Sequence, residues 1–136
     1  MKLDNYIASL IFSEPPAEKQ KIRIAIIGSR TFNNYKLLQR TLDTFYPNIS
    51  LIVSGGAQGA DALAEEYART EGIRTLIFKP DWKTYGKAAG FVRNKDIVTS
   101  VDIVIAYWDC VSRGTANSIE WAYKLNKPVI IVPDFI

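Results

Sequence analysis

Three short segments rich in glycine and hydroxyl side chains could together bind an anion. Residues 54–61 read SGGAQGAD; they follow an apolar run and lead into a helical pattern. Glycines at such a turn can adopt positive φ and direct successive backbone N–H groups at one point, and a helix start favours a negative charge. Residues 28–30 (GSR) and 112–115 (SRGT) add hydroxyl groups and rigid guanidinium donors. This pattern predicts a site for a phosphate or a carboxylate.

Each segment also has a purely structural interpretation. The glycines could serve a tight strand-to-helix turn, with Asp61 only complementing the start of the helix. Arg30 could be exposed on a loop, and Ser112 could cap a helix without any ligand. Residues 53–61 match neither G-x-x-x-x-G-K-[ST] nor G-x-G-x-x-G, which disfavours nucleoside triphosphate hydrolysis by a P-loop.

The composition narrows the chemistry. The 136 residues include no histidine and a single cysteine, and they carry a formal net charge of +3. Without histidine, a Ser-His-Asp triad, a Cys-His pair and histidine metal sites are excluded, so proton transfer would use carboxylate, tyrosine, lysine or water. We expect no metal and no cofactor. The mild positive charge suits a phosphate-bearing ligand, and we do not expect nucleic acid as a partner.

The apolar pattern predicts strands and helices that alternate along the chain. The β-branched run 22–27 ends at Gly28 and is typical of a strand buried on both faces. Further strands are expected at 50–56, 74–80, 102–108 and 127–133, and helices at 35–45, 59–71, about 91–100 and 112–126. The alternation predicts a Rossmann-like three-layer α/β/α fold with a parallel five-stranded sheet in the order 3-2-1-4-5.

The two ends of the chain are expected to differ in role. Residues 1–21 combine an amphipathic stretch with a polar, proline-bearing linker, so we expect an N-terminal arm before a nucleotide-binding domain at 22–136. The start lacks the apolar core of a signal peptide, and no apolar stretch is long enough to span a bilayer. We therefore expect a cytoplasmic protein with no membrane partner. The apolar arm could pair copies into a homo-oligomer.

The predicted strand order places the three segments at one cleft. Strands one and four are neighbours where the winding direction reverses, and ligands bind there, outside the carboxyl ends of the strands. Arg93 and Asn94, before strand four, could cover the ligand or simply be solvated. Asp109, directly after strand four, could accept from a ribose hydroxyl, position water or anchor its loop. Trp82, near a predicted loop, could stack on a base.

Five motifs carry a family resemblance. In chain order they are IAIIGSRTF, IVSGGAQGADALAEEYA, DWKTYGKAAGFVRN, DIVIAYWD and SRGT, and the match covers residues 22–133. Together they resemble the SLOG superfamily of Rossmann-like nucleotide-binding domains, specifically its YspA-like group of unknown function. The resemblance implies a nucleotide or a nucleotide-derived ligand.

One related group implies an enzyme. Phosphoribohydrolases of the Lonely Guy type have an arginine on the helix before strand four and a G-G-x-G-T-x-x-E turn after it. Arg93 is similar to that arginine, and Gly114 with Thr115 to the G-T pair. Ser118 stands where that group has its essential glutamate, and Glu120 lies about 200° further around a helix and would face elsewhere.

The other related group implies DNA binding. The DNA-processing protein DprA has an S-G-x-A-x-G-x-D turn similar to residues 54–61, and its family binds single-stranded DNA and a recombinase. The present chain lacks that family's additional domains and a strong basic face, so this implication is weaker.

The sequence thus predicts binding or sensing of a nucleotide or a nucleotide-derived ligand. The alternatives are a phosphoribohydrolase or N-glycosidase, in which Arg93 binds phosphate and Asp109 or Asp61 stabilises positive charge, and a DprA-like module for single-stranded DNA. The candidate catalytic residues are Arg93 and Asp109. The candidate ligand-binding residues are Gly28, Ser29, Arg30, Ser54, Gly55, Gly56, Gly59, Ala60, Asp61, Trp82, Arg93, Asn94, Asp109, Ser112, Gly114 and Thr115.

Overall fold

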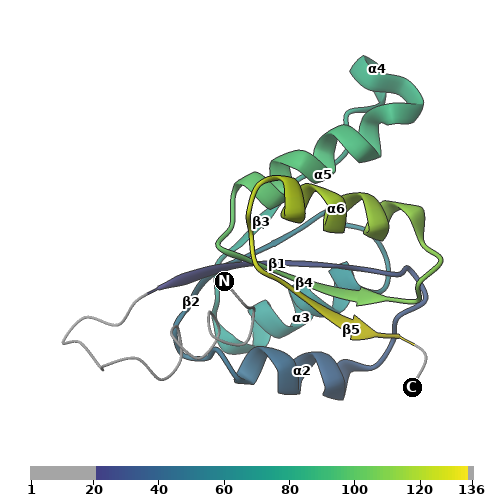
Figure 1. Ribbon diagram of the computed structural model, residues 1–136. Helices are drawn as coiled ribbons and strands as arrows, with labels where there is room; N and C mark the ends of the chain where they lie inside the picture. Colours follow the sequence, from purple (N-terminus) through teal and green to yellow (C-terminus); the bar gives the residue numbers. More distant parts are fainter. Residues whose placement is uncertain (1–20, 135–136) are drawn as a thin grey trace.

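The structure, a computed structural model, describes residues 21–134. The expected N-terminal arm lies outside these residues, except for Lys21 at its end. Strands and helices alternate through the described part of the chain (Figure 1). The strands are β1 (Ile22–Gly28), β2 (Ile49–Ser54), β3 (Thr75–Ile77), β4 (Ile103–Trp108) and β5 (Val129–Pro133). The helices are α2 (Tyr35–Asp43), α3 (Ala60–Glu71), α4 (Trp82–Tyr85), the 3-10 turn η1 (Gly86–Ala88), α5 (Ala89–Thr99) and α6 (Arg113–Lys124).

The sheet confirms the predicted Rossmann-like topology. Its order is β3-β2-β1-β4-β5, and each neighbouring pair is parallel. Helices α2 and α3 cover one face, and α5 and α6 cover the other (Figure 1). The winding direction therefore reverses between β1 and β4, as predicted.

Strand β1 reads as a continuous apolar run because both of its faces are buried. Ile24 and Ile26 point to the side of α2 and α3, whereas Ala25 and Ile27 point to the side of α5 and α6. The first core layer includes Leu38, Leu42, Phe45, Ile52 and Tyr67. The second includes Val53, Ile97, Val98, Val104 and Ile119. These two layers fix the central strand, and with it the position of the loop that follows.

Strand β3 is shorter than predicted. It spans three residues instead of 74–80 because it pairs only with β2, which ends at Ser54, opposite Ile77. All three β3 residues are exposed, including Leu76 and Ile77. Strand β3 is thus a short edge strand whose side chains contribute little to the core.

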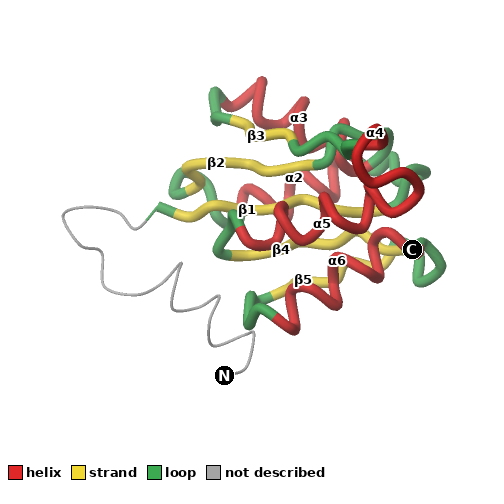
Figure 2. Tube along the Cα trace, turned by 90° about the horizontal axis from the view of Figure 1, so that it is seen from above, coloured by secondary structure: helices red, strands yellow, loops and turns green. Residues whose placement is uncertain are grey.

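The connection from β3 to β4 also differs from the prediction. It forms α4, in which Asp81 Oδ1 accepts from the Thr84 backbone N–H at 3.1 Å, before η1 leads into α5 at Ala89. Because α5 begins before residue 91, Arg93 lies in its second turn. Seen from above, α4 lies at the end of the sheet where β1 and β4 terminate (Figure 2). Within residues 21–134, no helix is long and apolar enough to cross a bilayer.

Candidate functional site

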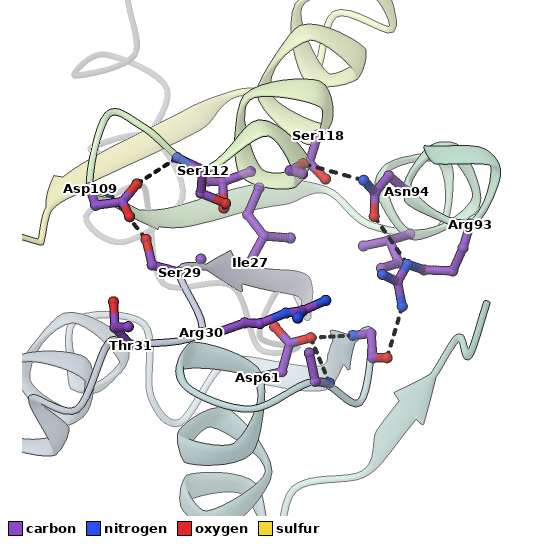
Figure 3. Close-up of a pocket in the computed structure, with 16 residues that line it drawn as sticks. Ile27, Ser29, Arg30, Thr31, Asp61, Arg93, Asn94, Asp109, Ser112 and Ser118 are labelled. Carbon is purple, nitrogen blue, oxygen red and sulfur yellow. Dashed lines mark hydrogen bonds between the residues drawn. The ribbon is translucent and has the colours of Figure 1, made fainter. Parts of the chain in front are cut away.

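A cavity of about 390 Å³ opens where β1, β2 and β4 end. It brings together loops that lie far apart in sequence (Figure 3). The lining includes most of the residues that the sequence predicted as candidates: Gly28, Ser29, Arg30, Gly55, Asp61, Arg93, Asn94, Asp109, Ser112, Gly114 and Thr115. The cavity lies at the reversal of the sheet, where α/β folds of this kind bind ligands.

Five predicted ligand residues are not among the lining residues: Ser54, Gly56, Gly59, Ala60 and Trp82. The hydroxyl of Ser54 instead donates to Glu65 Oε2 at 2.9 Å. Gly59 has a φ of +77°, and a Cβ there would lie 2.6 Å from the carbonyl oxygen of Arg30, so this glycine serves contact with the 29–30 loop. Trp82 lies on α4 and is 58% exposed.

The backbone N–H groups of the glycine turn donate to side chains of the same segment, residues 54–61. Asp61 Oδ2 accepts hydrogen bonds from the backbone N–H groups of Gly55, at 3.0 Å, and Ala57, at 3.1 Å. The N–H of Gly56 donates to Ser54 Oγ at 3.4 Å. Gly56 has the predicted positive φ, whereas Gly55 does not. The turn therefore does not present these three N–H groups to a ligand, contrary to the prediction.

Asp61 is a buried carboxyl group at the edge of the cavity. It is 7% exposed and lies in the first turn of α3. Burial raises the pKa of Asp61 to about 6, although the hydrogen bonds from Ala57 and Gly55 and the charge of Arg93 act to lower it. This carboxyl group therefore changes charge close to neutral pH.

Arg93 is held in place by backbone carbonyl groups. Its Nη1 donates to the carbonyl oxygens of Gly55 at 2.8 Å and Phe78 at 3.0 Å, and its Nε donates to Asn94 Oδ1 at 3.0 Å. The Asn94 amide is in turn anchored on α6 through the carbonyl of Gly114 at 3.3 Å. Among residues 21–134, Nη2 of Arg93 has no acceptor, so it remains available at the cavity.

Two guanidinium groups border the cavity. Figure 3 shows the side chain of Arg30 extending across the cavity toward the side on which Arg93 lies. Burial lowers the pKa of Arg93, Asp61 opposes this effect, and the positive charge of Arg30 lowers the pKa further. The two cations are therefore close enough to repel each other, and an anion between them would relieve that repulsion.

Asp109 anchors the loop after β4. Its Oδ1 accepts from the backbone N–H groups of Val111 at 2.9 Å and Ser112 at 2.7 Å, while its own N–H donates to Ser29 Oγ at 3.2 Å. Donation from Ser112 and Val111 holds the pKa of Asp109 below its usual range. Of its three sequence-based interpretations, this geometry supports loop anchoring.

The start of α6 has unsatisfied backbone donors. The side chain of Ser112 does not cap the helix; its Oγ lies 3.2 Å from Thr115 Oγ1 instead. The backbone N–H groups of Gly114 and Thr115 have no acceptor within the described part of the chain, and both residues line the cavity. Free N–H groups at a helix start attract anions. The backbone N–H groups that lack an acceptor at the cavity thus lie at the start of α6, whereas those of the glycine turn are bonded within the turn.

The sequence did not identify five of the lining residues as candidates: Ile27, Thr31, Ala57, Ile97 and Ser118. Ile27 and Ile97 belong to the buried core, and no sequence signal separates them from other core positions. Ser118 is 2% exposed and lies three residues after Thr115 on α6, so helical spacing could have identified it. Glu120 is exposed and is not a lining residue, in line with its helical position.

The fold is similar to two solved structures of DNA processing protein A. The protein from Helicobacter pylori, described for its single-stranded DNA binding mode, is 25% identical with a TM-score of 0.67; the match covers 84% of this chain and 66% of that one. The protein from Streptococcus pneumoniae is 20% identical with a TM-score of 0.72, over 85% of this chain and 52% of that one. The latter similarity shows the fold alone.

The expectation that nucleic acid is not a partner is contradicted by this similarity. The H. pylori protein binds single-stranded DNA, and it shares the fold over most of the present chain. The expectation rested on the formal net charge of only +3 and on the lack of a strong basic face and of the additional domains of DprA. A net charge does not reveal a local concentration of cations such as Arg30 and Arg93 at one cavity.

Sequence comparison assigns the family. The chain is 33% identical over 117 residues to the Gene 61 protein of Mycobacterium phage D29, which covers 79% of this chain and 94% of that protein. A family model described as YspA, cpYpsA-related SLOG family matches residues 22–85. These residues contain both β1 and the glycine turn. The chain therefore belongs to the YspA, cpYpsA-related SLOG family.

Proposed function

We propose that the cavity binds the phosphate-bearing part of a nucleotide or a nucleotide-derived ligand. The observation that carries this proposal is the meeting of two arginine side chains with the open N-terminus of α6. Arg30 and Nη2 of Arg93 supply positive charge, and the backbone N–H groups of Gly114 and Thr115 supply directed donors. Phosphate oxygens accept from both kinds of donor.

The remaining lining suits the sugar of a nucleotide. Hydroxyl groups of Thr31, Thr115 and Ser118 border the cavity and can donate to or accept from a ribose. Ile27 and Ile97 add an apolar surface. A volume of about 390 Å³ falls within the range of small-molecule sites, roughly 300–1,000 Å³. We propose binding or sensing as the role of this cavity.

The test is a melting-temperature panel with nucleoside mono- and diphosphates, NAD and ADP-ribose. At least one compound should raise Tm in the wild type and fail to do so in Arg30→Ala, because Arg30 is exposed and has no hydrogen-bond partner among the described residues. Arg40→Ala, an exposed arginine on α2, is the matched control and should respond like the wild type. If no compound raises Tm, the proposal is wrong.

The same mixtures test the hydrolase alternative. Asp61 supports it, since a carboxyl group with a pKa of about 6 at a cavity can exchange protons near neutral pH. Ser118 argues against it, because it stands at the position of the glutamate in the related phosphoribohydrolases. Release of free base would indicate an enzyme, and a stabilising ligand that stays intact would indicate a binding protein.

A single-stranded nucleic acid is the second candidate ligand. The similarity to the H. pylori protein, over 84% of this chain, favours it. A strand would place one of its phosphates between the arginines, and neighbouring nucleotides would leave the cavity. Affinity would then increase with oligonucleotide length and fall steeply with salt, whereas a mononucleotide site would show no length dependence.

A further inference from the structure

A group of exposed aromatic and lysine side chains lies in the segment that runs from Lys79, before α4, through η1 to the start of α5. We call it the aromatic-lysine ridge; it consists of Trp82, Tyr85 and Phe91 with Lys79, Lys83 and Lys87. Trp82 is 58% exposed, Tyr85 50% and Phe91 49%, and residues 81–88 are all exposed. Figures 1 and 2 show α4 projecting from the body of the fold at the carboxyl end of the sheet.

The exposure of these aromatic groups is unusual. Large aromatic side chains gain most when they are buried, and neighbouring exposed ones mark a binding surface. Trp82 and Tyr85 are three residues apart on α4, so they lie on the same side of the helix. They contribute nothing to either core layer. The ridge therefore presents two exposed aromatic side chains on the same side of one short helix.

The charge of the segment identifies the class of partner. Residues 79–95 contain five basic residues and a single acidic one, in a chain whose formal net charge is +3. The acidic residue, Asp81, is engaged as the cap of α4. Lysines are depleted in the centre of protein–protein interfaces, whereas aromatic groups interleaved with cations are typical of single-stranded nucleic acid sites. The ridge fits an anionic strand with unpaired bases better than a second protein.

Arg93 connects the ridge to the cavity. It lines the cavity, and its Nη1 donates to the carbonyl oxygen of Phe78, the residue directly before Lys79 of the ridge. We propose that a single-stranded nucleic acid runs from the cavity onto the ridge, where its bases stack on Trp82 and Tyr85 and the lysines contact its phosphates. This inference rests on the proposed phosphate site of the cavity.

The experiment compares one nucleotide with a strand. The full chain is titrated with thymidine monophosphate and with oligo(dT) of about 12 nucleotides, a length within the roughly 4–16 nucleotides of known single-strand sites. The variant Trp82→Ala/Tyr85→Ala should lose about tenfold or more in affinity for the oligonucleotide, since each stacked base contributes measurably. Its affinity for the monophosphate should not change. Arg30→Ala should weaken both ligands.

Two controls separate stacking from general surface effects. Tyr123→Ala removes an aromatic side chain that is 66% exposed near the far end of α6, and it should bind both ligands like the wild type. Trp82→Phe/Tyr85→Phe keeps the ring faces and should restore most of the lost affinity. Circular dichroism and Tm of each variant should match the wild type, because residues 82 and 85 are not buried.

The other possible binding results contradict the ridge proposal, the cavity proposal or both. If the alanine double variant binds the oligonucleotide as tightly as the wild type, or if the wild type binds only the monophosphate, the ridge proposal is wrong and the cavity proposal stands. If oligonucleotide affinity depends on the ridge and not on Arg30, the cavity proposal fails, and the proposed path of the strand from the cavity onto the ridge fails with it. If no strand binds and the double variant instead dissociates an oligomer in sedimentation, the ridge is a contact between copies and the proposal is overturned.

Discussion

The guanidinium of Arg93 occupies the space that a side chain on residue 55 would fill. Nη1 of Arg93 bonds to the Gly55 carbonyl oxygen at 2.8 Å, and a Cβ on Gly55 would lie 2.5 Å from the same nitrogen. A glycine of the β2 turn and an arginine of α5 therefore form one unit, although they are 38 positions apart in sequence.

Gly55→Ala should displace Arg93. The φ of Gly55 lies outside the left-handed region, so alanine fits the backbone and the clash falls on the guanidinium. Loss of the hydrogen bonds to Gly55 and Phe78 should lower the free energy of unfolding by about 1–3 kcal/mol. Urea denaturation measures this change. Gly90→Ala, where nothing lies within 4 Å, is the control and should be neutral or stabilising; an equal loss in both variants would contradict the explanation.

Asp61 should make stability fall as pH rises from about 4 to about 6. Its pKa of about 6 in the folded state lies above the unfolded value, so the folded protein binds more protons in this window. The contribution is fully present below the unfolded pKa and is lost as pH rises through the folded pKa, with a difference on the order of 2–3 kcal/mol.

Asp61→Asn is the variant that isolates this effect. Both backbone donors bond to the single oxygen Oδ2, so the carbonyl oxygen of asparagine can keep both bonds. The free energy of unfolding of wild type and Asp61→Asn, measured across this pH range, should converge at the acidic end and diverge toward neutral pH in favour of the variant. A constant difference would show that Asp61 does not titrate in this window.

Asp109 should behave as a loop anchor. Asp109→Asn keeps the acceptor for the N–H groups of Val111 and Ser112, so it should retain most of the ligand affinity. Asp109→Ala removes that acceptor and should lower both the free energy of unfolding and the ligand affinity. Isothermal titration and urea denaturation of the pair provide the check. Equal loss of affinity in both variants would assign the negative charge itself a role at the ligand.

Gly59→Ala should be among the most damaging glycine changes. Its φ is +77°, and the new Cβ would lie 2.6 Å from backbone atoms of Arg30, which cannot move as a side chain can. We expect a loss on the order of 2–4 kcal/mol. Gly86→Ala is the comparison, because its φ of +55° and ψ of −134° are close to the +77° and −126° of Gly59 and nothing lies within 4 Å of it; its cost should be smaller, on the order of 1–3 kcal/mol from backbone strain alone. Equal Tm losses would remove the contact explanation.

The sequence was sufficient for the topology because each strand is a short apolar run between helical patterns. Ile24 to Ile27 show this most clearly, since burial on both faces leaves a continuous β-branched stretch. The length of β3 is overestimated from the sequence because an edge strand ends where the strand that it pairs with ends. The end of β2 cannot be inferred from the residues of β3 themselves.

The location of the cavity was also predictable, whereas the role of each glycine was not. The rule that ligands bind at the reversal of the sheet correctly grouped the three loops. The glycines, however, are explained by distant partners: Gly55 by Arg93, and Gly59 by the loop at Arg30. Spacing within the motif carries no information on these contacts, so a phosphate-binding turn and a self-contained turn look alike in sequence.

Asp61 competes with any external anion for the backbone N–H groups of the glycine turn. The Asp61 carboxylate is six residues from its donor Gly55, so its effective concentration at that N–H group is on the order of millimolar or more. A dissolved phosphate would have to exceed this concentration to bind the same N–H group. An external anion would have to displace Asp61 before it could accept from these N–H groups. A motif that looks like an incomplete phosphate loop thus already holds an anionic group of its own, the Asp61 carboxyl.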